Sequence, residues 1–347
     1  MGMEEKRTAG VQIREIAERL GVSQSTVSVV LGGRGDSIRI SKETQKRVQD
    51  MAREMNYRPN IYARRLRHAE EEVPYVIAVF WRMDSLNSRI GRFIRGLYEA
   101  AERKKCKVEM VIQPYKPGEL MAHADMLSGN RISGAIISGL STADQQELEK
   151  GEYSVPIILI ERESARFHCI MMDTYRTGEQ CIAYMAAPEV KTAAFIGFDN
   201  NNRSERKMEA GYVYGCRDRG IRVKEDWNAY LACSSYENGY GAAAKVLANV
   251  ELPSAWLVAD CRLAGGILDC IHDKGLRIPE DIRLIFFEDS GILKYNKPPL
   301  SSVDVPSYEM AETALDIVLL AGYRQMDIPI RRELAPLYFI RESSGKQ

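Results

Sequence analysis

Hydrophobic residues near the start of the chain recur with the period of short α-helices. The first set, spaced i, i+3, i+4 and i+7, is Ile13, Ile16, Ala17 and Leu20. Such a set forms one face of a helix. Gly21 follows where a tight turn is favoured, and Ser23 can cap a second helix over residues 24–31. The pattern predicts a helix-turn-helix, whose second helix enters the DNA major groove by its N-terminal end, although any small helical hairpin can show the same offsets.

The residues after this hairpin add further helices and an excess of positive charge. Ser41 can cap a third helix that ends before Pro59, and Asn60 can cap a fourth over residues 61–67. From Arg39 to His68 there are nine Lys and Arg but only three Asp and Glu. This is the charge expected for contacts with phosphate groups, and it favours DNA binding over a purely structural hairpin.

From Pro74 onward, short apolar runs of strand length alternate with amphipathic helices. The candidate strands are Val76–Phe80, Val108–Ile112, Gly134–Ile137, Ile157–Ile160, Cys169–Met172, Ala193–Gly197, Ala255–Ala259, Leu284–Phe287 and Ser301–Val305. Continuous apolar strands that alternate with helices favour parallel sheets covered on both faces. The length of this part fits two doubly wound α/β lobes better than one.

Composition changes the picture through the distribution of charge. The chain has 347 residues, and its 48 Lys and Arg balance 48 Asp and Glu. Residues 1–70 contain 14 basic and 9 acidic residues, a net charge of +5, and residues 71–347 contain 34 and 39, a net charge of −5. The neutral total therefore does not argue against a polyanionic partner. With 45% hydrophobic and 28% charged residues, the chain is not fibrous, disordered or a disulfide scaffold.

The sequence gives no sign of export, metal binding or catalysis. It has no apolar N-terminal segment like a signal peptide and no apolar run near the ~18 residues of a membrane span, so we expect a soluble protein of the cytoplasm. The seven cysteines form no C-x-x-C pair and the four histidines have no zinc spacing. We expect reduced thiols, no metal and no cofactor. No G-x-S-x-G elbow or phosphate-binding loop is present, which argues against an enzyme, and Cys261 beside Asp260 is expected to be a plain buried thiol.

The N-terminal motifs resemble the head and hinge of the LacI/GalR family of bacterial transcription regulators. The matching residues are Ile13–Ala17, Gly21–Ser23, Thr26–Ser28, Arg39–Ser41, Thr44, Val48, Asn56–Asn60, Ala63 and Leu66. The resemblance implies that Gln24 and Ser25 read base edges and that Leu66 is a hinge wedge in the minor groove. An apolar side chain between base steps unstacks and kinks the duplex, which is physically consistent with this role.

The resemblance also implies a set of DNA contacts. The expected residues are Ser23, Gln24, Ser25, Thr26, Ser28, Val29, Arg34, Tyr57, Asn60, Ala63, Arg64 and Leu66. Many relatives carry Arg at the position of Val29, and valine offers only apolar contact, for example to a thymine methyl group. We therefore expect an operator that differs from the common family consensus.

The rest of the chain resembles the type I periplasmic-binding-protein fold that forms the effector-binding core of this family. In that fold the chain crosses between two lobes three times, here expected near residues 172–174, 303–307 and 332–336. We expect an all-α helix-turn-helix head (1–58), a hinge helix and linker (59–73), and an α/β core for effector binding and dimerisation (74–347). The first lobe is expected at about 74–172 and 306–333, and the second at about 173–305 and 334–347.

Candidate effector-binding residues follow from the ends of the expected strands. Ligands of open α/β sheets bind beyond the carboxyl ends of the strands, and in this fold between the lobes. The candidates are Trp81, Arg82, Asp84, Glu161, Arg162, Asp173, Met208, Asp260 and Glu288. Trp81 can stack on a sugar or a base, but a tryptophan at a strand end is as often partial core. Each charged residue, taken alone, is more readily a solvated loop residue, and it is their common position on one rim that indicates a site.

Three departures from the family pattern fall on the sugar-binding positions. Met208 replaces the arginine three residues before Gly211, Asp260-Cys261 replaces Asn-Asp, and Phe286-Phe287-Glu288-Asp289 replaces Gly-Phe-Asp-Asp. Relatives hold sugar hydroxyls with that arginine, the asparagine and the first aspartate. The departures predict a remodelled pocket. Either its ligand is not a plain sugar, or its affinity for a ligand has weakened altogether.

We expect a homodimeric, sequence-specific DNA-binding regulator that acts as a repressor. A small-molecule effector between the lobes, a sugar or another metabolite, is expected to modulate its affinity for a pseudopalindromic double-stranded operator. The alternative is a cytoplasmic solute-binding or sensor protein with a diverged pocket that acts as a regulator without a sugar ligand. We expect no membrane partner.

Overall fold

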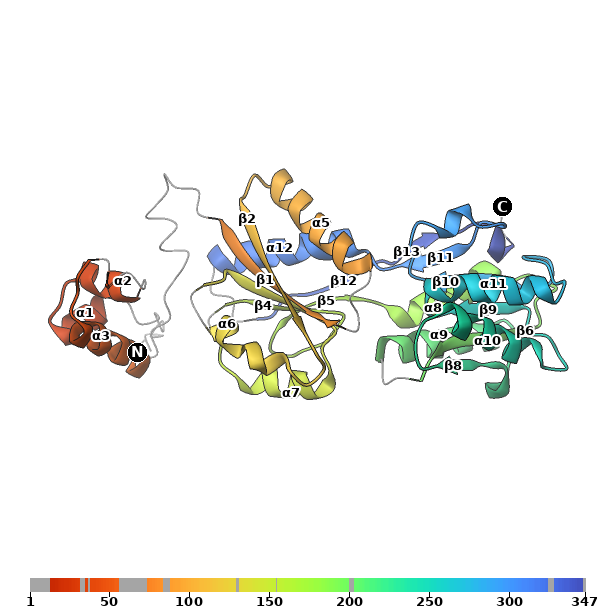
Figure 1. The fold of residues 1–347 in the computed structure, drawn as a ribbon, viewed down its shortest axis with the longest axis horizontal. Coiled ribbons are helices and arrows are strands. Elements are labelled where there is room, and N and C mark those ends of the chain that lie inside the picture. The colour runs from red at the N-terminus through yellow and green to blue at the C-terminus, as the bar shows by residue number, and fades with distance from the viewer. Residues whose placement is uncertain are drawn as a thin grey trace, which may run out of the picture.

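The chain folds into a small helical head and two α/β lobes (Figure 1). The computed structural model describes residues 13–31, 35–36, 38–55, 74–83, 88–128, 131–153, 155–199, 203–323 and 328–345. The expected fourth helix and the rest of the hinge, residues 59–73, lie outside these ranges. None of the helices within them is long and apolar enough to cross a membrane.

Three helices of the head pack around one small core. They are α1 (Ile13–Leu20), α2 (Gln24–Leu31) and α3 (Lys42–Glu54). Ile16, Val27 and Val48, one from each helix, are completely buried in this core. Gly21 adopts a φ of +65° between α1 and α2, a conformation that favours glycine. The predicted helix-turn-helix is confirmed.

The first lobe is a six-stranded parallel sheet in the order β12-β5-β4-β3-β1-β2. Its strands are β1 (Tyr75–Arg82), β2 (Val108–Tyr115), β3 (Gly134–Ser138), β4 (Ile157–Ile160), β5 (His168–Met172) and β12 (Arg331–Leu334). One face is covered by α5 (Ser88–Arg103) and α12 (Ser307–Tyr323), and the other by α6 (Ala124–Ser128), α7 (Thr142–Lys150) and the 3-10 helix Leu120–His123 (Figure 1). Successive side chains of β1 alternate between the two hydrophobic cores, as expected for a strand that is buried on both faces.

The second lobe is a seven-stranded sheet in which only β13 runs antiparallel. Its path is β13-β11-β10-β9-β6-β7, and β8 also pairs with β6. The strands are β6 (Thr192–Phe198), β7 (Arg222–Val223), β8 (Ala229–Leu231), β9 (Ala255–Val258), β10 (Arg283–Phe287), β11 (Ser301–Asp304) and β13 (Leu337–Phe339). Helices α8 (Thr174–Met185) and α9 (Arg203–Asp218) cover one face, and α10 (Tyr236–Leu247) and α11 (Ala264–Asp273) cover the other. Four short 3-10 helices lie at Glu225–Trp227, Cys261–Leu263, Leu293–Tyr295 and Glu342–Ser344.

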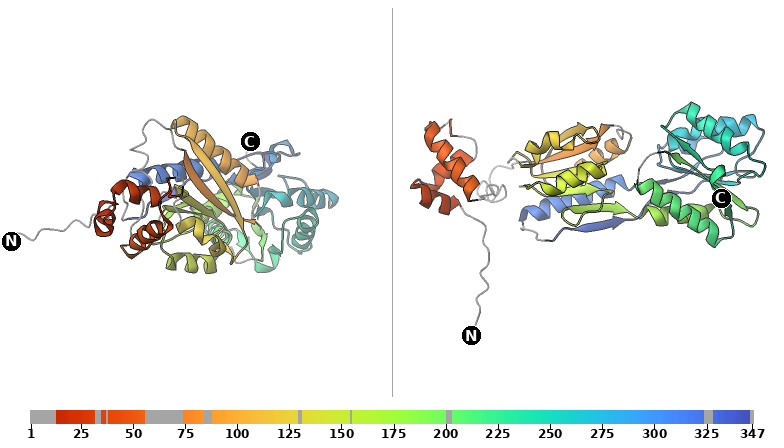
Figure 2. Two further views of the ribbon diagram at one scale, coloured as in Figure 1. Left: turned by 60° about the vertical axis from the view of Figure 1, so that its left-hand side comes forward. Right: turned by 90° about the horizontal axis from the view of Figure 1, so that it is seen from below.

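Neither lobe is a continuous segment of chain. The backbone passes from the first sheet to the second between β5 and α8, returns between β11 and α12, and passes again between β12 and β13. Figure 2 shows these connections running side by side between the lobes. The expected architecture of two doubly wound lobes is confirmed.

The nine strands expected from apolar runs are all present, and the differences concern edges and lengths. β1 extends to Arg82, so Trp81 and Arg82 lie within the strand and not after it. The hydrophobic pattern does not reveal β7, β8, β12 and β13, which are only two to four residues long. Most of these residues are exposed or half-buried, and short polar strands at or near a sheet edge carry little hydrophobic signal.

Helices α8 and α9, which begin at the interlobe cleft, are held together by an unusually close backbone approach. A Cβ atom on Gly178 would lie 1.9 Å from the carbonyl oxygen of Met208, and a Cβ atom on Gly211 would lie 1.9 Å from that of Tyr175. No L side chain fits at such distances without a shift of the backbone. The two glycines therefore fix the N-terminal half of α8 against the middle of α9.

We predict that Gly211→Ala lowers the free energy of unfolding by about 1–3 kcal/mol, because the methyl group forces α8 and α9 apart. Urea denaturation followed by circular dichroism measures this change. Gly241→Ala is the matched control, because Gly241 is also helical and has no atom within 4 Å of its ideal Cβ position. The control is expected to be neutral or slightly more stable, and an equal loss in both variants would contradict the helix-contact explanation.

Candidate functional site

The N-terminal end of α2 is exposed and is fixed by a hydroxyl cap. The Oγ of Ser23 accepts a hydrogen bond of 3.0 Å from the Thr26 N–H. The hydroxyl oxygens of Ser25 and Thr26 lie 2.7 and 2.8 Å from the same atom. Gln24 and Ser25 are exposed at this end. The arrangement presents an amide and several hydroxyl groups to solvent on a rigid helix start.

The other expected DNA contacts divide into two groups. Thr26, Ser28 and Val29 are half-buried on α2, beside the buried Val27 and Val30. The remaining residues lie outside the described ranges: Arg34, Tyr57, Asn60, Ala63, Arg64 and Leu66. The head therefore brings together the six candidates from Ser23 to Val29.

Arg89, in the first turn of α5, connects the two lobes. Its guanidinium group donates to the carboxylate of Glu161, which follows β4 in the first lobe. It also lies 3.4 Å from the carboxylate of Glu288, which follows β10 in the second lobe. The three side chains are only 11–19% exposed. Burial opposes the charge of Arg89, but the two carboxylates outweigh it and raise its pKa, whereas burial raises the pKa of Glu288.

A second interlobe bridge lies one helical turn further along α5. The Nη1 of Arg92 donates to the Asp304 carboxylate at 2.5 Å and to the Asp289 carbonyl oxygen at 2.7 Å. The carboxylate of Asp289 accepts a bond of 2.6 Å from Arg341 of its own lobe. Arginines and carboxylates thus fill the interlobe surface beside α5.

Glu161 and Glu288 occupy equivalent places in the two lobes and share a strained backbone. Their φ values are +56° and +68°, in the left-handed region. Their N–H groups donate to the neighbouring strand, at the carbonyl oxygens of Ile170 and Val303 respectively. A left-handed conformation costs a non-glycine residue on the order of 1–2 kcal/mol. Such conformations gather at functional sites, which makes this pair of strand ends a functional candidate.

Two of the expected effector residues lie in hydrophobic cores. Trp81 is 3% exposed, and its ring centroid lies 5.7 Å from that of Phe93. Met208 is 2% exposed in the core between α8, α9 and the second sheet. Of the two roles that the sequence left open for Trp81, stacking on a ligand or partial core, its position fits the core, because its ring packs on the α5 side of the first sheet.

The remaining candidates are engaged in local contacts. Asp173 caps α8 by accepting a 3.0 Å bond from the Arg176 N–H. Asp260 is 5% exposed and accepts bonds of 2.6 Å from Arg262 and 2.7 Å from Ser234. Arg82 donates to the carbonyl oxygen of Gly139, and Asp84 lies outside the described residues.

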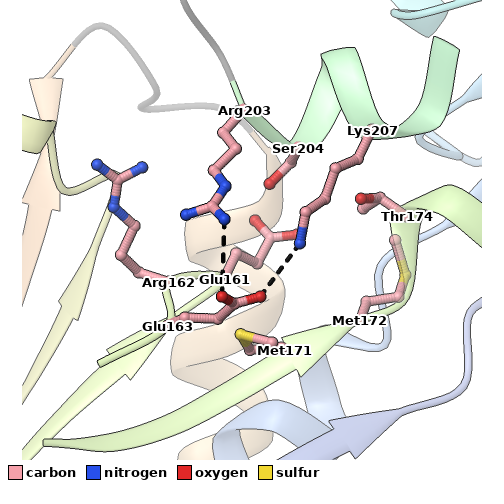
Figure 3. A pocket seen from close by; sticks show the side chains of 9 residues that line it. All are labelled: Glu161, Arg162, Glu163, Met171, Met172, Thr174, Arg203, Ser204 and Lys207. Atoms are coloured by element: carbon pink, nitrogen blue, oxygen red, sulfur yellow. Dashed lines mark hydrogen bonds and ion pairs between the residues drawn. The ribbon is translucent and has the colours of Figure 1, made fainter. Parts of the chain in front are cut away.

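A pocket opens between the lobes at the first passage of the chain (Figure 3). It is lined by Glu161, Arg162, Glu163, Met171, Met172, Thr174, Arg203, Ser204 and Lys207. The Glu163 carboxylate of the first lobe lies 3.1 Å from the Lys207 ammonium and 3.7 Å from the Arg203 guanidinium of the second. Expected residues Glu161 and Arg162 are therefore brought together here with basic residues of α9.

Sequence reasoning did not select Arg89, Arg92, Arg203 or Lys207. The signal for the first two was their i, i+3 spacing beside the apolar stripe of α5, which places them on adjacent turns. The partners of Arg89 are 72 and 199 positions away in the sequence. No local pattern can reveal a pairing at that separation.

The one nucleophile considered from the sequence is not activated. Cys261 is 7% exposed, and burial followed by the charge of Asp260 raises the pKa of its thiol to about 11. A thiol of this kind is protonated at neutral pH and unreactive. Within the described ranges, no group of three or more His, Cys, Asp or Glu side chains is arranged to hold a metal ion.

A helix-turn-helix head joined to a two-lobed ligand-binding core defines a DNA-binding transcription regulator. The family model for bacterial regulatory proteins of the lacI family matches residues 12–60, and the model for the periplasmic binding protein-like domain matches residues 182–344. The chain belongs to the LacI/GalR family of bacterial transcription regulators. The characterised members of this family that it resembles are regulators and not enzymes.

Relatives and solved structures resemble the chain along most of its length. The sucrose operon repressor of Klebsiella pneumoniae is 25% identical over 342 residues, 96% of this chain and 99% of that protein. The fructose operon regulatory protein of Vibrio cholerae is 25% identical over 93% of this chain and 97% of that protein. A LacI family regulator from Clostridium acetobutylicum, 27% identical, superposes with a TM-score of 0.71 over 77% of this chain and 99% of that one. The lac repressor dimer bound to operator and the anti-inducer ONPF, 21% identical, shares the fold with a TM-score of 0.67 over 97% of this chain and 99% of that one.

We predict that Arg89→Met loosens the contact between the lobes. The change leaves Glu161 and Glu288 facing each other in a largely buried place, which is expected to cost about 3–5 kcal/mol. Thermal unfolding measures the loss, and small-angle scattering measures the expected increase in the radius of gyration.

Arg95→Met is the matched control for this prediction. Arg95 lies on the same helix and is 72% exposed, and the ion pair that the structure describes for its side chain is with the nearby Glu99. Its stability is expected to be unchanged. Adding Glu288→Gln to Arg89→Met is expected to restore part of the lost stability, because it removes one of the two opposed charges. An Arg89→Met protein as stable and compact as the parent would contradict the bridging role.

Proposed function

We propose that this protein is a homodimeric regulator of the cytoplasm that binds a pseudopalindromic operator and represses transcription. The observation that carries the proposal is the rigid, exposed start of α2, where Ser23 caps the helix and Gln24 and Ser25 face solvent. A helix of this kind reads bases by its N-terminal residues, and a two-fold dimer presents two of them to adjacent turns of DNA. The net charge of +5 in residues 1–70 supports contact with phosphates.

We assign roles to the residues of the head on this basis. Gln24 and Ser25 contact base edges, Ser23, Thr26 and Ser28 contact phosphates or bases, and Val29 offers apolar contact. Leu66 is proposed as a wedge in the minor groove of a hinge formed by residues 59–73, and Arg34, Tyr57, Asn60, Ala63 and Arg64 complete the DNA contacts.

We also propose that a small molecule between the lobes controls operator affinity. The division of the chain is proposed as head (1–58), hinge and linker (59–73) and core (74–347), with lobes at about 74–172 with 306–333 and 173–305 with 334–347. Arg89 contacts residues of both lobes, and so does the pocket at Glu161 and Arg162. A ligand that draws the lobes together here therefore changes their relative position. A ligand that prefers one arrangement shifts the population of the DNA-binding state.

The alternative is a regulator that works without a sugar ligand. It is supported by the acceptor groups of the second lobe, which are already bonded within the protein: Glu288 to Arg89, Asp289 to Arg341 and Asp260 to Arg262. A neutral sugar would have to compete with these charge-assisted bonds for the same carboxylates. Operator binding that no metabolite changes would favour this alternative.

We predict that Gln24→Ala relaxes base preference at the operator position it contacts, at a cost of about 1–3 kcal/mol for a good bidentate contact. Selection of bound fragments from random-sequence DNA, carried out on the parent and the variant, measures this change. Gln180→Ala makes the same chemical change on an exposed position of α8 and is the control. Identical selected motifs for all three proteins would contradict base reading by Gln24, and no selected motif for the parent would contradict the proposed function.

A further inference from the structure

The pocket between the lobes is lined by three cationic side chains, Arg162, Arg203 and Lys207. Arg162 bonds to neutral partners, with its Nε 2.8 Å from the amide oxygen of Gln145 and its Nη2 2.8 Å from the hydroxyl of Thr142. Burial, and then the positive charges of Arg203 and Arg82, lower the pKa of Arg162. An arginine stays charged in spite of such a shift, and none of the described residues forms an ion pair with it, so the first lobe presents this cation at the pocket wall.

The second lobe supplies two more cations from the first two turns of α9. Arg203 and Lys207 both approach Glu163, at 3.7 and 3.1 Å, and Lys207 is the main cause of the lowered pKa of that carboxyl. Figure 3 shows the Glu163 carboxylate between these two side chains, with Arg162 on the neighbouring wall. The place between these two cations is thus already taken by a carboxylate of the protein itself, that of Glu163.

The strengths of the competing ion pairs indicate which group a ligand can replace. Glu163, Arg203 and Lys207 are 50%, 63% and 44% exposed, and exposed ion pairs contribute only about 0–1 kcal/mol. The carboxylates of Asp260 and Glu288, in contrast, are 7% and 11% exposed and bonded to Arg262 and Arg89. The buried carboxylates of Asp260 and Glu288 are therefore already engaged with arginines, whereas Arg203 and Lys207, which could donate to an anion, are held weakly by Glu163.

We infer that the effector is a small anion, carrying a phosphate or a carboxylate group, which displaces Glu163 from Arg203 and Lys207 and is contacted by Arg162 from the opposite lobe. This inference rests on the proposed function, because it assigns the chemical class of that regulator's effector. The hydroxyl-bearing residues Thr174 and Ser204 line the same space at the starts of α8 and α9, where helix N-termini favour negative charge. Because the cations come from both lobes, a bound anion stabilises the closed arrangement.

The test compares charged and neutral small molecules on the full chain. Melting temperatures are measured with glucose, glucose 6-phosphate, citrate and inorganic phosphate, each against sodium chloride of equal ionic strength. Glucose 6-phosphate, citrate or both are expected to raise the melting temperature by several degrees at millimolar concentration, whereas glucose is expected to have no effect. The glucose 6-phosphate and citrate arms distinguish a phosphate ester from a carboxylic acid as the natural ligand class, and a response to inorganic phosphate shows that the phosphate group alone is bound.

Variants locate the binding site. Arg203→Gln is expected to weaken anion binding at least tenfold, whereas Arg206→Gln, an exposed arginine of the same helix outside the pocket, leaves it unchanged. Glu163→Gln removes the competing carboxylate and is expected to tighten anion binding several-fold. Anion binding that is insensitive to Arg203→Gln, a response to glucose equal to that of its phosphate, or no response to any anion in both the parent and Glu163→Gln would overturn the inference.

Operator selection on the same preparations separates this inference from the proposed function. A protein that selects a DNA motif but responds to none of the anions keeps the proposed function and refutes the anionic effector. A protein that binds an anion through Arg203 but selects no DNA motif refutes the proposed function and keeps the site.

Discussion

The contact of Arg89 with Glu161 and Glu288 is the point through which the two lobes hold each other. One guanidinium group meets the ends of β4 and β10, and both carboxylates sit on left-handed backbone. Arg92 adds a second bridge to Asp304, so a single helix of the first lobe contacts two strand ends of the second. Charges held in such surroundings are costly to separate, and the relative position of the lobes is therefore set by electrostatics as well as by the three chain passages. The pocket lined by Arg162 and Glu163 lies next to the Arg89 contact, because Glu161 belongs to both.

Much of the architecture follows from the period of apolar residues. The helices from Ile13 to Leu31 and the nine apolar strands of the core appear where the pattern places them, because burial of one helix face or of both strand faces leaves a strong signal. Strands such as Arg331–Leu334 carry mostly charged residues at a sheet edge, so their place is decided by backbone pairing with β5 and not by side-chain pattern. Edge strands of this kind become visible only when the rest of the sheet is assembled.

The candidate site could be predicted less completely than the fold. The rule that ligands bind at strand ends selected Glu161, Arg162 and Glu288, which the structure places at the cleft. The same rule selected Trp81, whose ring turns into the core because the strand continues for two more residues, to Arg82, than the expected strand Val76–Phe80. It could not select Arg89 or Arg203, since an arginine near a helix start is usually solvated and its partner lies far away in the sequence. Pairings between distant charged residues require the fold before they can be seen.

The discontinuous lobes have a consequence for synthesis of the protein on the ribosome. The head is contiguous and its core is complete once α3 has emerged. The first lobe lacks α12 and the edge strand β12 until after most of the second lobe has been made, although Met310, Leu315 and Val318 of α12 belong to its hydrophobic core. In a nascent chain, the side chains of β4 and β5 that α12 covers therefore lack that helix during translation of more than a hundred residues. The DNA-reading end can fold early, whereas the sensing core becomes complete only near the end of translation.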